Sequence, residues 1–126
     1  MQAQVIPFDD NETAYVVALC ELQTNLVASA SVNGKLKLLD VQTSTFVQQS
    51  SLPGLVRDLS YSSPSSLLSV TSEAVSLHDF RTNLQESISI PLLGAAPFTA
   101  GAANTGMNMI ATGYELKGAD AFIDIW

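Results

Sequence analysis

The stretch LVASASVNGKLKLLD, residues 26–40, is the clearest structural signal in the sequence. Apolar and polar residues alternate on both sides of Asn33-Gly34. An Asn-Gly pair between two alternating segments is the strongest short-range signal for a β-hairpin, because a type I′ turn requires positive φ at both central positions. The stretch therefore predicts two antiparallel strands joined by a tight turn at Asn33-Gly34.

Two later stretches share this organisation: LLSVTSEAVSLHD at 67–79 and MIATGYELKGADAFIDIW at 109–126. Each begins with apolar residues, passes through small residues and a turn, and ends in an alternating segment. The corresponding end positions, Leu39, His78 and Trp126, are 39 and 48 residues apart, and the second step is lengthened by a longer turn. A period of about 40–45 residues is typical of four-stranded propeller blades.

Short segments rich in Val, Leu and Ile recur along the whole chain, and Ser, Asn, Gly and Pro separate them. Such segments predict short strands rather than helices. Pro64 has a fixed φ and no amide hydrogen, so Ser62-Ser63-Pro64 is expected to be a turn. The predicted strands are 3–8, 15–21, 26–32, 35–41, 45–51, 56–61, 66–71, 74–80, 86–92, 97–102, 108–113 and 121–126.

On these residues the sequence resembles the WD-repeat β-propellers. SASVNGKLKLLD is similar to the family's inner hairpin, with Asn33 in place of the turn Asp and Leu39 in place of the Trp. VRDLSYSSPSSLLSVTS, residues 56–72, is similar to the first two strands of a blade, and MIATGYE and FIDIW match the same pattern in the third unit. The family's Gly-His pair is absent, so we expect blade rigidity to come mainly from apolar packing, with His78 half-buried and not a ligand.

The predicted fold is all-β: a β-propeller of four-stranded antiparallel blades, three blades per chain, in a single domain over residues 1–126. The third unit has three strands before Trp126. The N-terminal strand is therefore expected to act as the outer strand of a blade. The blade units are about 11–53, 54–94 and 95–126 plus 3–10.

Three blades are too few to close a ring, because known propellers have about 4–8. Apolar faces would be left open at both ends. The chain is then either part of a longer propeller or a half-propeller that pairs with itself or with another chain. We expect self-association into a closed ring, with a homodimer favoured and each N-terminal strand completing the partner's last blade; the sequence does not separate this from a heteromeric ring.

The amino-acid composition limits which classes of binding partner are expected. The net charge is -7, from 12 acidic and 5 basic residues that form no run, so neither nucleic acid nor an anionic membrane surface is an expected partner. The hydrophobic share is 47% and the charged share 13%, below the usual charged share of about 25%, which favours a partner that covers apolar surface. No signal peptide or membrane span is recognisable, and an intracellular location, cytoplasmic or nuclear, is expected.

Motifs for catalysis are not found. The sequence has no glycine-rich phosphate loop, no His/Cys metal cluster and no nucleophile elbow. Cys20 is the single cysteine and is expected to be a small core residue. The acidic residues Asp9, Asp10 and Glu12, and the pair Asp120 and Asp124, are interpreted as solvated turn and strand-edge residues. We therefore expect no enzyme activity, no cofactor and no metal.

The resemblance implies a non-catalytic scaffold for protein partners, with contacts made by loops at one face of the ring. Arg57, an isolated cation expected near the channel mouth of an acidic protein, is the leading candidate. Tyr, Arg and Phe are types favoured at binding hot spots. The candidate partner-binding residues are Glu12, Tyr15, Asn33, Lys35, Leu55, Arg57, Glu73, Phe98, Tyr114, Glu115 and Lys117.

Two alternatives stay open. One is a small-ligand or glycan-binding propeller module, although the aromatic residues Tyr61, Phe80 and Trp126 fall at different blade positions. The other is an engineered or truncated propeller fragment with no partner but itself. Chain ends that carry neither a tag nor a tail would fit this alternative.

Overall fold

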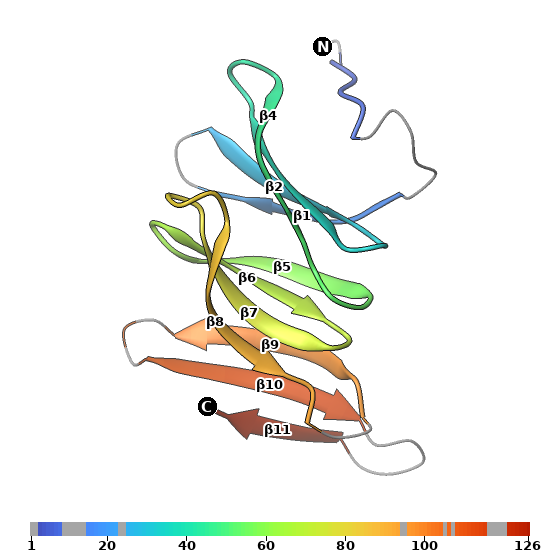
Figure 1. Cartoon of the computed structure of the whole chain (residues 1–126), viewed down its shortest axis with the longest axis vertical. Helices are drawn as coiled ribbons and strands as arrows, with labels where there is room; N and C mark the ends of the chain where they lie inside the picture. Colours follow the sequence, from blue (N-terminus) through green and yellow to red (C-terminus); the bar gives the residue numbers. More distant parts are fainter. Residues whose placement is uncertain are drawn as a thin grey trace.

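The computed structural model describes residues 3–8, 15–22, 25–93, 96–104, 106, 108–115 and 121–126. Within these residues the protein is all-β. Its strands form three antiparallel sheets, which are stacked one after another along the long axis of the molecule (Figure 1). The sheets do not close into a ring, and their stacking is consistent with a β-propeller-like fold. No helix in the described part of the chain is long and apolar enough to cross a membrane.

Each sheet is a meander in which every strand pairs with the next along the chain. The first sheet has the order β1-β2-β3-β4, the second β5-β6-β7-β8 and the third β11-β10-β9. The strands are β1 (Val16–Glu21), β2 (Leu26–Ser31), β3 (Lys35–Asp40), β4 (Thr45–Ser51), β5 (Val56–Ser63), β6 (Ser66–Thr71), β7 (Ala74–Asp79), β8 (Gln85–Pro91), β9 (Phe98–Asn104), β10 (Met109–Glu115) and β11 (Ala121–Ile125).

The N-terminal strand is the prediction that the structure corrects. Residues 3–8 contain no strand. Instead they lie against the outer face of the first sheet, where the Phe8 and Phe46 rings pack edge to face with centroids 5.9 Å apart. An apolar face without a neighbouring sheet attracts apolar side chains of the same chain, and this contact does not require strand pairing. In this structure the segment therefore covers a sheet face and does not extend a sheet edge.

The turn at Asn33-Gly34 also differs from its prediction. Gly34 has φ +93°, whereas Asn33 is not among the described residues with positive φ. The amide of Gly34 donates to the carbonyl of Ser31 at 3.1 Å, so the strands are joined by a three-residue loop with glycine in its left-handed position. The hairpin was predicted correctly, but its turn type was not.

Two hydrophobic cores hold the three sheets together. The core between the first and second sheets is centred on Leu36, Leu38 and Leu67, and the core between the second and third on Val70, Val75 and Phe98. The first strands of the sheets also lie side by side, since β1 contacts β5 and β5 contacts β9. The second sheet thus packs one face on the first sheet and the other face on the third, whereas the first and third sheets each have one outer face without a neighbouring sheet.

The candidate interaction surfaces

Backbone hydrogen bonds gather the predicted contact loops along one edge of the stacked sheets, which we call the loop edge. The amide of Val32 donates to the carbonyl of Tyr15 at 3.0 Å, and the amide of Ser72 donates to the carbonyl of Leu55 at 2.8 Å. In the third sheet the amide of Phe98 donates to the carbonyl of Ser72 at 3.2 Å. The start of each sheet's first strand is thereby tied to a neighbouring turn, on the right of Figure 1.

Several candidate residues lie on this edge with exposed side chains. Tyr15 and Leu55 precede β1 and β5 and are exposed. Asn33 and Glu73 lie in the β2–β3 and β6–β7 turns and are also exposed. Lys35 is half-buried at the start of β3.

Arg57 stands at a bulge that recurs in all three sheets. Val56 pairs with Thr71 and Asp58 pairs with Val70, so Arg57 is the inserted residue. Val17 in β1 and Thr99 in β9 are inserted at the corresponding places. A bulge redirects a side chain and often lies next to a functional site. The exposed Arg57 side chain is therefore presented by the same backbone device in the middle of the loop edge.

The remaining candidates are placed differently. Phe98 is only 4% exposed and belongs to the core between the second and third sheets, so its side chain is not exposed on the loop edge. Its burial follows from the packing of the third sheet, to which it belongs, on Val70 and Val75 of the second sheet. Tyr114 is half-buried and stacks on Phe122, with ring centroids 5.6 Å apart. Glu115 ends β10, and Glu12 and Lys117 lie outside the described residues.

In both the second and the third sheet, a ring nitrogen forms a hydrogen bond with a hydroxyl group. His78 Nε2 lies 2.8 Å from Ser69 Oγ, and Trp126 Nε1 donates to Thr112 Oγ1 at 2.9 Å. His78 is 2% exposed, more buried than predicted, and its Nδ1 lies 3.3 Å from the carbonyl oxygen of Leu84. Because a carbonyl only accepts, Nδ1 carries the proton and Nε2 accepts from the serine hydroxyl. Burial lowers the pKa of His78 below its ordinary value, which keeps the ring neutral.

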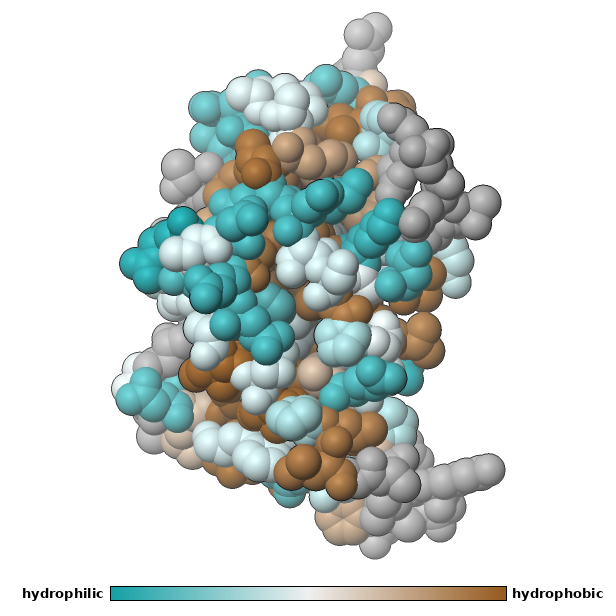
Figure 2. Space-filling model, viewed as in Figure 1, coloured by the Kyte–Doolittle hydropathy of each residue, from teal (hydrophilic) through white to brown (hydrophobic). Residues whose placement is uncertain are grey.

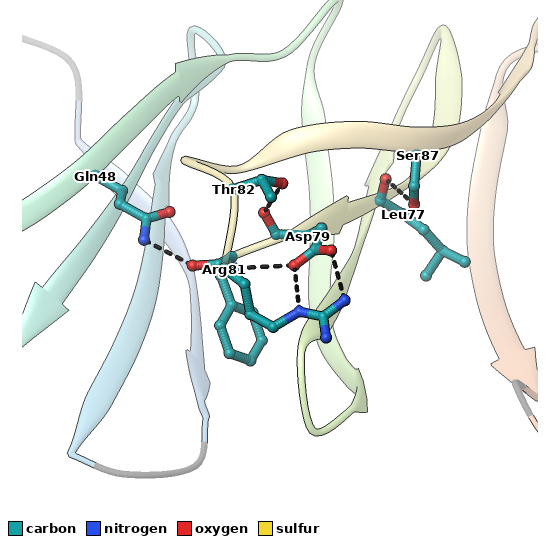
Figure 3. A network of polar contacts seen from close by, with 7 residues as sticks. Gln48, Leu77, Asp79, Arg81, Thr82 and Ser87 are labelled. Carbon is teal, nitrogen blue, oxygen red and sulfur yellow. Dashed lines mark hydrogen bonds and ion pairs between the residues drawn. The ribbon is translucent and has the colours of Figure 1, made fainter.

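Aspartates stabilise the turns at the opposite edge. Asp40 Oδ1 accepts from the amide of Gln42 at 2.9 Å, and Asp79 Oδ1 accepts from the amide of Arg81 at 2.9 Å. The guanidinium of Arg81 also contacts both oxygens of Asp79 (Figure 3) and lowers the pKa of that carboxyl. In the same view Gln48 Nε2 donates to the carbonyl of Phe80 at 2.7 Å, linking β4 to the second sheet. These contacts are structural.

The outer face of the third sheet carries exposed residues that were not among the predicted contact residues. Ile123 is 74% exposed and Ile125 is 59% exposed. Counted back from Trp126, they correspond to Val75 and Leu77 before His78, which are 0% and 7% exposed. The same positions in the first sheet are Leu36 and Leu38, both fully buried. The alternation in FIDIW was the signal that could have identified them.

Hydrophobic residues reach the surface at both ends of the stack. In Figure 2 they appear toward the upper end, over the first sheet, and toward the lower end, over the third sheet. The exposed ones include Val17 and Leu19 in β1 and Phe122, Ile123 and Ile125 in β11. Apolar surface at both ends is what the sequence predicted for an unclosed stack of blades.

The described residues contain no group of three or more His, Cys, Asp and Glu side chains placed to hold a metal ion. Burial is the main cause that raises the pKa of the half-buried Cys20 thiol, which disfavours the nucleophilic thiolate. Cys20 lines an open groove of about 890 Å³ with Leu19, Leu26 and Tyr61, mostly apolar side chains. Of the acidic residues singled out, Asp124 is exposed on β11, and Asp9, Asp10 and Asp120 lie outside the described residues.

No known protein family and no curated protein matches the sequence. Solved structures do match the fold. The computationally designed Ika4 protein superimposes with a TM-score of 0.71 at 22% identity, over 99% of this chain and 73% of Ika4. The computationally designed Ika8 protein gives 0.67 at 22% identity, over 93% of this chain and 34% of Ika8, so the chain spans about a third of that protein. At this identity the likeness shows the fold alone.

Proposed function

We propose that this chain is a partial β-propeller of the WD-repeat type, three blades long, whose end faces are closed by further blades. We further propose that the resulting ring is a non-catalytic scaffold for protein partners. The observation that carries the first proposal is the exposure of Ile123 and Ile125, at positions where the other two sheets bury their side chains against a neighbour.

The energetic argument rests on burial. Covering an aliphatic side chain of this size contributes about 1.5–3 kcal/mol. The outer face presents Ile123 and Ile125 beside the small residues Ala111 and Gly113, with which they pair across β10 and β11. A further sheet can therefore approach closely, as the second sheet does on the first. β11 is also an edge strand, whereas the first two sheets have a fourth strand after the corresponding one.

The scaffold proposal is supported by the loop edge. Tyr15, Leu55, Arg57 and Glu73 are exposed there on a backbone fixed by hydrogen bonds between strand starts and turns. A rigid set of exposed aromatic, apolar and charged side chains suits recognition of a protein surface better than catalysis.

A second candidate function is supported by the comparisons. Both of the similar structures described above are computationally designed proteins. This favours an engineered or truncated propeller fragment whose only partner is another copy of itself. The two proposals share the same end faces and differ in whether the loop edge has a partner.

Self-association through the third sheet tests the end-face proposal. We expect the mass of the full chain, measured by sedimentation at micromolar concentrations and above, to rise with concentration. The double variant Ile123→Asp/Ile125→Asp should remain a folded monomer, because it places two charges on the docking face. Ile88→Asp is the matched control, since Ile88 is a similarly exposed isoleucine on β8 of the middle sheet, and it should associate like the parent. A parent chain that stays monomeric, or a double variant that associates equally well, would contradict the proposal.

A further inference from the structure

We propose that residues 3–8 are a displaceable cover over the outer face of the first sheet, and that the face beneath them docks the outer face of the third sheet of a second copy. This inference rests on the end-face proposal above and adds which surface receives the third sheet and what regulates access to it.

The cover is held by apolar contacts that are incompletely packed. Ile6 and Phe8 face the first sheet across a cavity of about 130 Å³, which is also lined by Val16, Leu19, Val27, Ser29, Leu39 and Phe46. This gap opens partly to solvent, and the side chains that line it lose dispersion contacts that a packed interior would give them. A segment without strand pairing, seated over such a gap, is easier to displace than a packed sheet.

Lys37 fastens the cover at its Phe8 end. Its ammonium nitrogen lies 4.6 Å from the centroid of the Phe8 ring and 5.1 Å from that of Phe46. It also donates a hydrogen bond to the carbonyl of Phe8. At the other end of the cover, Ser44 Oγ donates to Gln4 Oε1 at 3.1 Å. The cation between two rings is the principal polar anchor of residues 3–8.

The covered face of the first sheet corresponds to the face of the second sheet that packs on a neighbouring sheet. Val27 pairs with Leu39 in the first sheet as Leu67 pairs with His78 in the second. Leu67 belongs to the core against the preceding sheet. The outer face of the first sheet is thus equivalent to a face that is buried inside the molecule.

The third sheet supplies the complementary face. Its outer residues Ile123 and Ile125 correspond to Leu36 and Leu38, which pack in the core between the first and second sheets. Docking the third sheet of one copy on the first sheet of another therefore repeats an interface that the chain already contains. Two copies placed this way form two identical interfaces and a ring of six blades, within the range of about 4–8 for propellers.

Lys37 makes the docking conditional. The same register position in the second sheet is Ser76, which is buried and lies 3.0 Å from Ser89 Oγ. An ammonium at that position is costly to bury. A second copy must therefore displace the cover and also solvate or redirect the Lys37 charge, so association is weaker than the apolar area alone would give.

The test measures cover opening and association separately in the full chain. Leu39, beneath the cover, is replaced by cysteine in a Cys20→Ser background, and its rate of reaction with a maleimide reports opening. Phe8→Ala and Lys37→Ala are introduced, with Arg81→Ala as a control that removes one positive charge from the β7–β8 turn, far from the cover. Loss of the cation–π contacts is expected to raise the labelling rate about 2- to 30-fold. The association constant measured by sedimentation should rise in step in Phe8→Ala, because the docking-competent fraction increases. It should rise further in Lys37→Ala, which also removes the charge that opposes docking.

Three results would overturn the proposal. Unchanged labelling in Phe8→Ala and Lys37→Ala would show that residues 3–8 do not cover the face. Faster labelling with unchanged association would show that a second copy is not the occupant. Weaker association in both variants would show that the segment holds copies together instead of separating them. Failure of the end-face proposal is distinguishable, because association would then be insensitive to Ile123→Asp/Ile125→Asp whatever the labelling rate.

Discussion

His78 Nε2 and Ser69 Oγ lie 2.8 Å apart inside the second sheet, and their hydrogen bond has the opposite polarity to the equivalent one in the third sheet. The imidazole accepts from the serine, whereas the indole of Trp126 donates to Thr112 Oγ1 at 2.9 Å. The position that is Trp in one sheet and His in another thus conserves a bond between strands while reversing donor and acceptor. The propeller-like repeat is maintained by geometry rather than by residue identity.

Removing the two hydroxyls should have unequal effects. Ser69→Ala leaves the buried His78 Nε2 without its donor, which should lower the free energy of unfolding by about 1–3 kcal/mol. Thr112→Val removes the acceptor of a half-exposed indole that water can reach, and about 0.5–1.5 kcal/mol is expected. Urea denaturation measures both. A larger loss in Thr112→Val than in Ser69→Ala would contradict the assigned polarities.

Acid should destabilise the protein through His78. Burial lowers its folded-state pKa below 6.5, so the unfolded chain binds a proton that the folded chain does not. The stabilising effect is fully present above pH 6.5 and is lost as the pH falls below that value, at up to about 1.4 kcal/mol per pH unit. Denaturation curves at several pH values check this. His78→Gln should flatten the dependence in this window; an unchanged slope would assign it to other groups.

Gly34→Ala should be strongly destabilising. Gly34 has φ +93°, and a Cβ there would lie 2.3 Å from the backbone oxygen of Leu52, which cannot move without breaking the strand connection. Backbone strain of this kind costs about 1–3 kcal/mol, and the clash adds to it. Thermal unfolding compares it with Gly106→Ala, whose Cβ would meet only Asn104 Oδ1 at 3.5 Å. Similar unfolding temperatures for the two variants would contradict the assigned turn.

Arg57→Glu should leave the fold intact and reduce binding of a protein partner at the loop edge. The side chain is exposed at a bulge, so we expect a change in stability within about 0.5 kcal/mol. A rim charge mainly affects association rate and its salt dependence. Circular dichroism and thermal unfolding check the fold, and surface plasmon resonance at two salt concentrations checks binding once a partner is identified. Unfolding of the variant would show that Arg57 has a structural role.

The sequence by itself determined the strands after residue 15, their hairpins and their repeat. These depend on local properties: alternation along a segment, glycine in a left-handed turn and the spacing of like segments. Residues 26–40 illustrate this, since both strands form as predicted and pair across the turn. The apolar ends of the stack were also predictable, because the repeat leaves a first and a last face without a neighbour.

Tertiary structure alone decided how the nonlocal contacts are arranged. The sequence pattern around an aromatic residue at the start of a strand is the same whether the residue faces solvent or a neighbouring sheet. Only the packing of the third sheet on the second buries Phe98. Residues 3–8 were predicted to form a strand, yet they form none and pack on the outer face of the first sheet through Phe8. The position of Lys37 between Phe8 and Phe46 follows from that placement. Such contacts depend on which surfaces meet, which a local pattern does not encode.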